Sequence, residues 1–221
     1  MALFTLGTGG RKRLIQRWNA LMRSLRAPEE VQFRGLDDLL RRYGEPHRSY
    51  HNLYHLEALF EALEPHPVQE QAALELAVWF HDAVYDTTRN TNEEESAALA
   101  ARALEPLGRG LARRVSGMVL ATKHHRSDDP TTRLLLDADL SILGAEEAVY
   151  RRYSRAIRQE YAWVPPEAYR EGRLRVLHAF LSRPQVYVTP AFAGLEEAAR
   201  ANLRWEIGWL EQLQPAQLSR Y

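Results

Sequence analysis

Hydrophobic side chains recur three and four residues apart along almost the whole chain, the pattern of amphipathic α-helices packed on a common core. Proline and glycine interrupt this pattern often enough to separate helices of ordinary length. The sequence has no alternation typical of half-buried strands, no internal repeat and no linker. The expected helices cover approximately residues 11–26, 29–43, 47–63, 68–85, 93–104, 111–125, 132–143, 146–161, 167–181 and 194–213.

These segments predict an all-α fold, a compact single-domain helical bundle over residues 11–221. Residues 1–10 are rich in glycine and threonine, and we expect them to form a flexible N-terminus. Trp205 and Trp209 on the last helix suit the core. The alternative is an interface that pairs two copies in a homodimer.

The charge is balanced, with 29 Lys and Arg against 29 Asp and Glu, which argues against nucleic acid or an anionic membrane as the main partner. The chain has no cysteine, so any metal must be held by histidine and carboxylate. No apolar run reaches the ~20 residues that span a bilayer, and the N-terminal charges follow the short apolar segment, unlike a secretory signal. We expect a cytoplasmic protein.

Residues 77–86 are the stretch around which the chain is organised. They open as an apolar run and then place His81 and Asp82 side by side. In a continuous buried helix both would point inward, because His81 shares a stripe with Leu74 and Asp82 shares one with Val78. A lone buried carboxylate costs several kcal/mol, roughly, unless it is paired or bound to metal. The pattern therefore indicates half of a metal site.

Two histidines precede this stretch. His51 and His55 are four residues apart, so they can face the same neighbour, and His55 shares an apolar stripe with Leu59. The alternative for such a pair is two hydrogen-bonded histidines in the core or at the surface.

Two aspartates lie in the apolar segment at residues 134–143. Asp139 is flanked by leucine and isoleucine on its own face, so it is the expected buried carboxylate. Asp137 shares a face with Arg133 and Ser141, which suggests a supporting or surface position. The alternative for Asp139 is a salt bridge between helices or a helix cap.

The helix before these aspartates ends in a short cationic segment. His125 continues an apolar stripe and could be an outer metal ligand or a phosphate contact, and Lys123 is a candidate phosphate contact. The alternative is a solvated helix end whose cations favour the C-terminal dipole.

Together these residues place a histidine, then His81 with Asp82, and then Asp139 on separate inward helix faces. Two histidines and two carboxylates suit a divalent transition metal, Mg²⁺ or Mn²⁺, with open positions for water and substrate.

The spaced set resembles the HD superfamily of metal-dependent phosphohydrolases, and is most similar to a bacterial branch of small predicted HD phosphohydrolases. The similarity covers roughly residues 33–213. The matching motifs are Tyr50-His51-Asn52-x-x-His55, Phe80-His81-Asp82-Ala83-Val84-Tyr85-Asp86, Asn92-Glu93-x-x-Ser96-Ala97, Thr122-x-x-His125, Asp137-Ala138-Asp139-Leu140-x-Ile142-Leu143-Gly144 and Arg158-x-Glu160-Tyr161.

This resemblance implies an all-helical bundle of the HD-domain type that hydrolyses a phosphate ester, often on a nucleotide or another small phosphorylated metabolite. The resemblance implies four metal ligands. It implies His55 rather than His51 as the first of them, because the first histidine of the superfamily precedes an aliphatic residue by four positions, and Leu59 follows His55 at that distance. The ion could be Mn, Mg, Fe, Co, Ni or Zn. Some nucleotidase branches carry a catalytic Glu after the His-Asp pair, where this chain has Tyr85 and Asp86. The implied ligands are His55, His81, Asp82 and Asp139.

The hypothesis is that the ion activates a water molecule, which attacks the phosphorus in line. Candidates to manage protons are His51, Asp86 and Glu93. Candidates to hold phosphate oxygens are Arg48, Lys123 and His125.

Two alternatives remain open. One is an oxidative HD-type enzyme with a di-iron centre, which needs about six ligands, the extra two being His51 and His125. The other is a catalytically silent module that binds metal or nucleotide.

Overall fold

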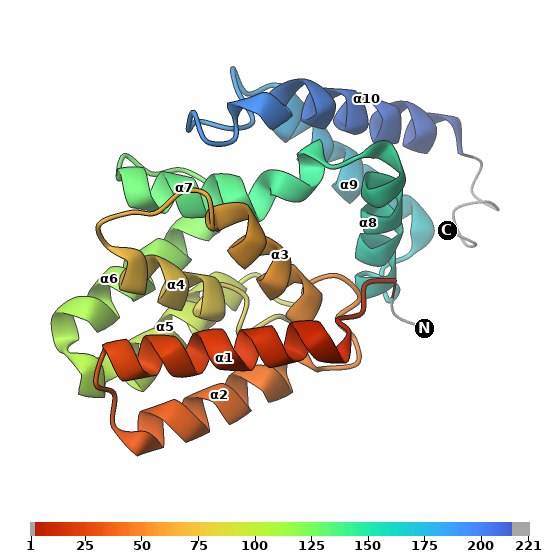
Figure 1. Ribbon diagram of the computed structural model, residues 1–221. Helices are drawn as coiled ribbons and strands as arrows, with labels where there is room; N and C mark the ends of the chain where they lie inside the picture. Colours follow the sequence, from red (N-terminus) through yellow and green to blue (C-terminus); the bar gives the residue numbers. More distant parts are fainter. Residues whose placement is uncertain (1–2, 214–221) are drawn as a thin grey trace.

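The computed structural model describes residues 3–213, and every regular element in that range is a helix, which confirms the all-α prediction (Figure 1). Short 3₁₀ helices occur at Glu105–Leu107, Leu140–Gly144 and Ala193–Leu195. The α-helices are α1 (Thr8–Ser24), α2 (Glu29–Tyr43), α3 (Leu53–Leu63), α4 (Gln71–Phe80), α5 (Asn92–Leu104), α6 (Arg109–Thr122), α7 (Pro130–Asp139), α8 (Glu147–Glu160), α9 (Pro166–Leu181) and α10 (Glu196–Gln212).

Helix α4 carries the apolar run that the sequence singled out, and nearly all of it is buried. In Figure 1, α1 and α2 lie on one side of the molecule, α10 lies on the other, and α3, α4 and α7 lie between them. Trp79 of α4 packs edge-on against Trp18 of α1, with ring centroids 5.3 Å apart, and lies 5.6 Å from Phe60 of α3. The core therefore fixes the end of α4, where the His-Asp pair begins.

The prediction that the helix runs through residue 85 is wrong, because α4 ends at Phe80. The amide of His81 still bonds to Ala77 O, but that of Ala83 turns back to Phe80 O at 3.1 Å. Arg48 Nη1 donates to Asp82 O at 2.7 Å and Nη2 donates to Ala83 O at 3.2 Å. These donors satisfy carbonyl groups outside the helix, so the chain can turn without leaving them unpaired.

Two other helices are shorter than expected at the ends that carry candidate residues. Helix α3 begins at Leu53, because the Asn52 side chain caps it by accepting the Tyr54 amide at 2.8 Å. Helix α6 ends at Thr122, and His125 then adopts a left-handed backbone with φ +48°. Both changes move histidines from helices into the turns beside them.

Part of the N-terminal segment packs against the core. Phe4 is buried against Tyr50 and Tyr54, with ring centroids 5.3 and 4.9 Å away, and α1 begins at Thr8. Its contact with Tyr50 holds the segment close to the histidine turn.

Trp205 and Trp209 are half-buried, stack on each other at 6.1 Å and pack against the core. The homodimer stays a prediction. Across residues 3–213, the structure contains no helix long and apolar enough to cross a membrane.

Candidate metal centre

Four side chains from three distant parts of the sequence lie close together. His55 comes from the start of α3, His81 and Asp82 from the turn after α4, and Asp139 from the end of α7. The Nε2 atoms of His55 and His81 are 3.0 Å apart. Asp82 Oδ2 lies 3.2 Å from His81 Nε2 and 3.7 Å from His55 Nε2. Asp139 Oδ1 lies 3.2 Å from His55 Nε2 and 3.6 Å from His81 Nε2.

The histidines present the atoms that a metal ion requires. His81 Nδ1 lies 2.9 Å from Val78 O, so it donates to that carbonyl and leaves Nε2 directed at the cluster. Both imidazoles are buried, while the two carboxylates keep some contact with solvent. Ligand atoms of His55, His81 and Asp82 all lie within 4.8 Å of one another. Two nitrogen and two oxygen donors are a set that fits a divalent cation.

The electrostatics keep both acids charged. Burial disfavours the carboxylate of Asp82, but the His81 imidazole outweighs it and lowers the pKa of Asp82 below its usual value. Burial likewise acts against Asp139, yet hydrogen bonds from His125, His55 and His81 hold its pKa well below the usual range. Charged carboxylates are the form that binds a cation.

His125 contacts the other side of the same aspartate. Its Nε2 lies 3.0 Å from Asp139 Oδ2, whereas Asp139 Oδ1 faces the two buried histidines. The left-handed backbone at His125 aims its side chain into the centre after α6 has ended. It is therefore a neighbour of the candidate centre.

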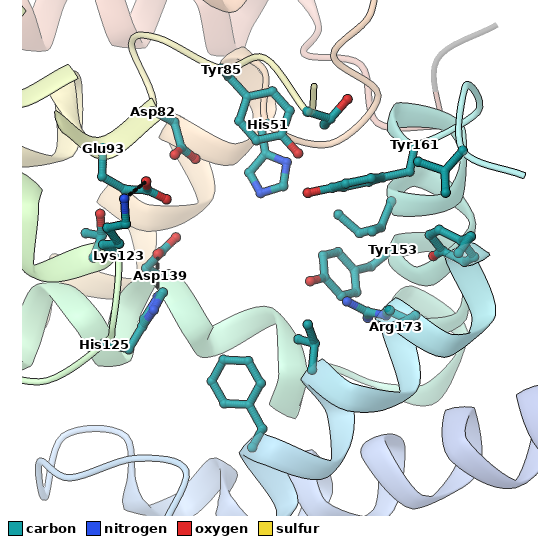
Figure 2. Close-up of a pocket in the computed structure, with 18 of the residues that line it drawn as sticks. His51, Asp82, Tyr85, Glu93, Lys123, His125, Asp139, Tyr153, Tyr161 and Arg173 are labelled. Atoms are coloured by element: carbon teal, nitrogen blue, oxygen red, sulfur yellow. Dashed lines mark hydrogen bonds and ion pairs between the residues drawn. The ribbon is translucent and has the colours of Figure 1, made fainter. Parts of the chain in front are cut away.

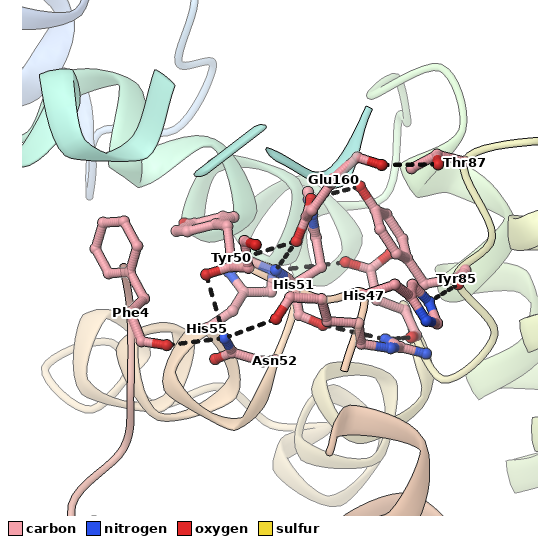
Figure 3. A network of polar contacts seen from close by, with 12 residues as sticks. Phe4, His47, Tyr50, His51, Asn52, His55, Tyr85, Thr87 and Glu160 are labelled. Carbon is pink, nitrogen blue, oxygen red and sulfur yellow. Dashed lines mark hydrogen bonds and ion pairs between the residues drawn. The ribbon is translucent and has the colours of Figure 1, made fainter. Parts of the chain in front are cut away.

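His51 belongs to a separate network that is centred on Glu160 of α8 (Figure 3). One oxygen of Glu160 accepts the amides of Tyr50 and His51 at 2.7 and 2.9 Å. The other lies 2.7 Å from His51 Nδ1 and accepts the Tyr85 hydroxyl at 2.8 Å. Burial disfavours a charged imidazole, but Glu160 raises the pKa of His51 above its usual value. Glu160 therefore orients the turn that leads to His55.

Glu160 belongs to one of the matching motifs, but the sequence alone assigned it no role. The available signal was its position on the same helical face as Tyr153 and Ile157, seven and three residues earlier. A carboxylate on an apolar stripe needs a partner.

Arg48, an expected phosphate contact, is a structural residue here. Its side chain has no solvent exposure, and its guanidinium donates to Asp82 O, Ala83 O and His51 O and to the Glu45 carboxylate. Its donors hold the two turns that carry the centre. It is directed at backbone rather than at a phosphate, so this expectation is corrected.

Of the two positions expected for Asp137, supporting or surface, its burial excludes the surface. Its carboxylate accepts the amides of Val188 and Thr189 at 3.1 and 2.7 Å and the Thr189 hydroxyl at 2.6 Å. It ties α7 to the segment before α10 and does not join the metal cluster. The pattern within one helix could not reveal this, since the partners are 51 and 52 residues away.

A cavity of about 620 Å³ opens in front of the cluster (Figure 2). Asp82, Asp139 and His125 form one side of it, and residues of α8 and α9 face them from the other. The predicted site residues among its lining are His51, Asp82, Glu93, Lys123, His125 and Asp139. The centre is therefore open to a small molecule on one side.

Two other expected residues occupy different surroundings. Lys123 lines the cavity, but its ammonium contacts the Glu94 carboxylate and donates to Asn90 O at 2.7 Å. Asp86 is 43% exposed and accepts the amide and hydroxyl of Thr88, outside the described lining of the cavity. Glu93 is the better placed of the two candidate acids.

Comparisons with known proteins give no assignment: no family model matches the chain, and neither the curated proteins nor the solved structures contain a match.

Proposed function

We propose that this chain is a metal-dependent phosphohydrolase of the HD type, acting on the phosphate ester of a small molecule. One observation carries the proposal. Two buried imidazole Nε2 atoms lie 3.0 Å apart, and each lies 3.2–3.7 Å from a carboxylate oxygen of Asp82 and of Asp139, the two acids that line a cavity. A purely structural cluster has little reason to place two histidine nitrogens face to face.

His55, His81, Asp82 and Asp139 would hold a divalent cation. When bound, such an ion supplies a Lewis acid that polarises phosphoryl oxygen and lowers the pKa of water.

The chain's own residues would orient the ester and move protons. His51, fixed by Glu160, and Glu93 both line the cavity, as Asp82 does. Either can exchange a proton with water or with the leaving group. His125 and Lys123 border the cavity beside Asp139 and would contact phosphate oxygens.

A second candidate is an oxidative HD-type enzyme with two iron ions. The observation that favours it is that the two oxygens of Asp139 contact different histidines. Oδ1 faces His55, and Oδ2 faces His125. In this candidate Asp139, His55 and His125 would all serve as ligands of the iron centre. Elemental analysis of protein purified without added metal would separate the two, since two irons per chain favour this candidate.

The direct test is turnover of a panel of phosphomonoesters by protein loaded with Mn²⁺, Mg²⁺, Co²⁺ or Ni²⁺. We expect phosphate release that requires the metal and is lost in Asp139→Ala. Full metal-dependent activity in Asp139→Ala would contradict the ligand assignment.

A further inference from the structure

The wall opposite the metal cluster is aromatic and aliphatic. It comes from α8, from α9 and from the turn between them, which Figure 2 shows across the cavity from Asp82 and Asp139. Its apolar and phenolic members are Tyr153, Ile157, Tyr161, Trp163, Val164, Tyr169, Val176 and Phe180.

Trp163 and Val176 stand out on this wall because they are large apolar residues that remain 57% and 45% exposed. The Trp163 indole is nevertheless held in place, since its Nε1 donates to Thr87 Oγ1 at 2.8 Å. Thr87 Oγ1 in turn donates to Glu160 O at 3.0 Å. An exposed ring fixed at the rim of a cavity is preorganised to pack against a ligand.

The cations of the cavity are already neutralised. Lys123 contacts the Glu94 carboxylate, and Arg173 donates to both oxygens of buried Glu206, at 2.8 and 2.9 Å. His51 and His125 each face a carboxylate as well. Within the described lining, no cation is left without an acidic partner.

The lining also contains three acids, Asp82, Glu93 and Asp139. A divalent cation would offset two of these three charges and leave no surplus positive charge, so each further negative charge on a ligand is opposed, and a single phosphate dianion is opposed less than a longer phosphate chain. A triphosphate chain carries roughly twice that charge and would meet no further unpaired cation.

We propose that this site takes a phosphomonoester with a single phosphate and an aromatic organic group, and that it discriminates against nucleoside triphosphates. The phosphate lies at the metal cluster and the ring packs on the α8–α9 wall beside Trp163. This inference rests on the proposed function for the position of the phosphate.

Binding tests it without turnover. Isothermal titration compares phenylphosphonate with methylphosphonate on Mn²⁺-loaded protein, because neither compound is a hydrolysable ester. We expect phenylphosphonate to bind about tenfold more tightly, and Trp163→Ala to remove most of that preference. Phe33→Ala is the matched control, since Phe33 is 64% exposed on α2, away from the cavity. Equal affinities for the two phosphonates would overturn the inference.

Turnover separates this inference from the proposed function. At fixed free Mn²⁺, we expect kcat/KM at least about tenfold higher for naphthyl phosphate than for glycerol 3-phosphate, and for adenosine monophosphate than for the triphosphate. A higher kcat/KM for the triphosphate, together with an unchanged kcat/KM in Trp163→Ala, would contradict this inference. It would still support the proposed phosphohydrolase activity. If no ester is hydrolysed with any metal, the proposed function fails, and the phosphonate comparison still decides the ligand class.

Discussion

Asp137 and Asp139 lie two residues apart at the end of α7 and turn their carboxylates to different partners. Asp139 contacts His55 Nε2 at 3.2 Å and His125 Nε2 at 3.0 Å. Asp137 accepts the Thr189 amide at 2.7 Å and anchors the segment before α10. Residues two apart on a helix diverge by about 200°, so one element serves the centre and the fold at once.

This relationship predicts opposite behaviour for two isosteric variants. Asp139→Asn should weaken Mn²⁺ binding by more than about 100-fold, because it removes a charged ligand rather than a supporting contact. Asp137→Asn should keep Mn²⁺ binding but lower the free energy of unfolding by about 2 kcal/mol, because charged hydrogen bonds to Val188 and Thr189 are weakened. Titration calorimetry and urea unfolding measure the two effects. Loss of metal affinity in Asp137→Asn alone would reverse the assignment.

The fold was predictable from the sequence because helical periodicity and core burial are local properties that neighbouring residues reveal. The apolar run before His81 predicted α4, and the face of His55 predicted its inward direction. The end of α4 was not predictable, since it depends on Arg48, which is 34 residues from Asp82 in the chain.

The candidate centre likewise has parts that the local sequence could predict and parts that depend on contacts between distant residues. The candidate ligands could be proposed from residue types, spacing and a family resemblance. The aromatic wall could not, because apolar residues of α8 and α9 look alike in sequence whether they face the core or a cavity. Figure 2 shows Tyr153 and Tyr161 on the cavity, a placement that depends on how helices pack.

Arg48 provides the second prediction. Arg48→Lys keeps the positive charge but cannot donate to Asp82 O, Ala83 O and His51 O together, because an ammonium lacks the planar fork. We expect the free energy of unfolding to fall by about 2 kcal/mol and KM for a phosphomonoester to change less than about threefold. Arg34→Lys, on an exposed pair with Glu30, is the control and should change stability by less than about 0.5 kcal/mol. A stable Arg48→Lys protein with a tenfold higher KM would restore the phosphate role.

Glu160 provides a prediction for acid stability. Burial raises the pKa of this carboxyl, but His51 and the backbone amides of Tyr50 and His51 outweigh burial and lower it to about 2. A folded-state pKa below the unfolded value means that the stabilisation is complete above the ordinary pKa of 4.5 and is lost as the pH falls toward 2. Glu160→Gln should therefore cost about 2 kcal/mol at pH 7 and progressively less between pH 4.5 and 2.

Chemical denaturation of both proteins across that pH range measures the difference. Glu147→Gln is the matched control on α8, because Glu147 is 62% exposed and pairs only with Arg151 among the described ion pairs. A cost for Glu160→Gln that stays constant down to pH 2 would show that the charge of the carboxylate contributes nothing.

Metal removal and return provide the last prediction. A ligand that binds only the folded state stabilises it by RT ln(1 + [L]/Kd), which is about 2.7 kcal/mol at 100 Kd. For a chain of 221 residues this raises Tm by roughly 5–10 °C. Protein stripped with a chelator should therefore gain that increment when Mn²⁺ is restored, as followed by circular dichroism. Asp139→Asn should lose the increment and Asp137→Asn should retain it. The same increment in Asp139→Asn would place the bound ion outside the cluster of His55 and His81.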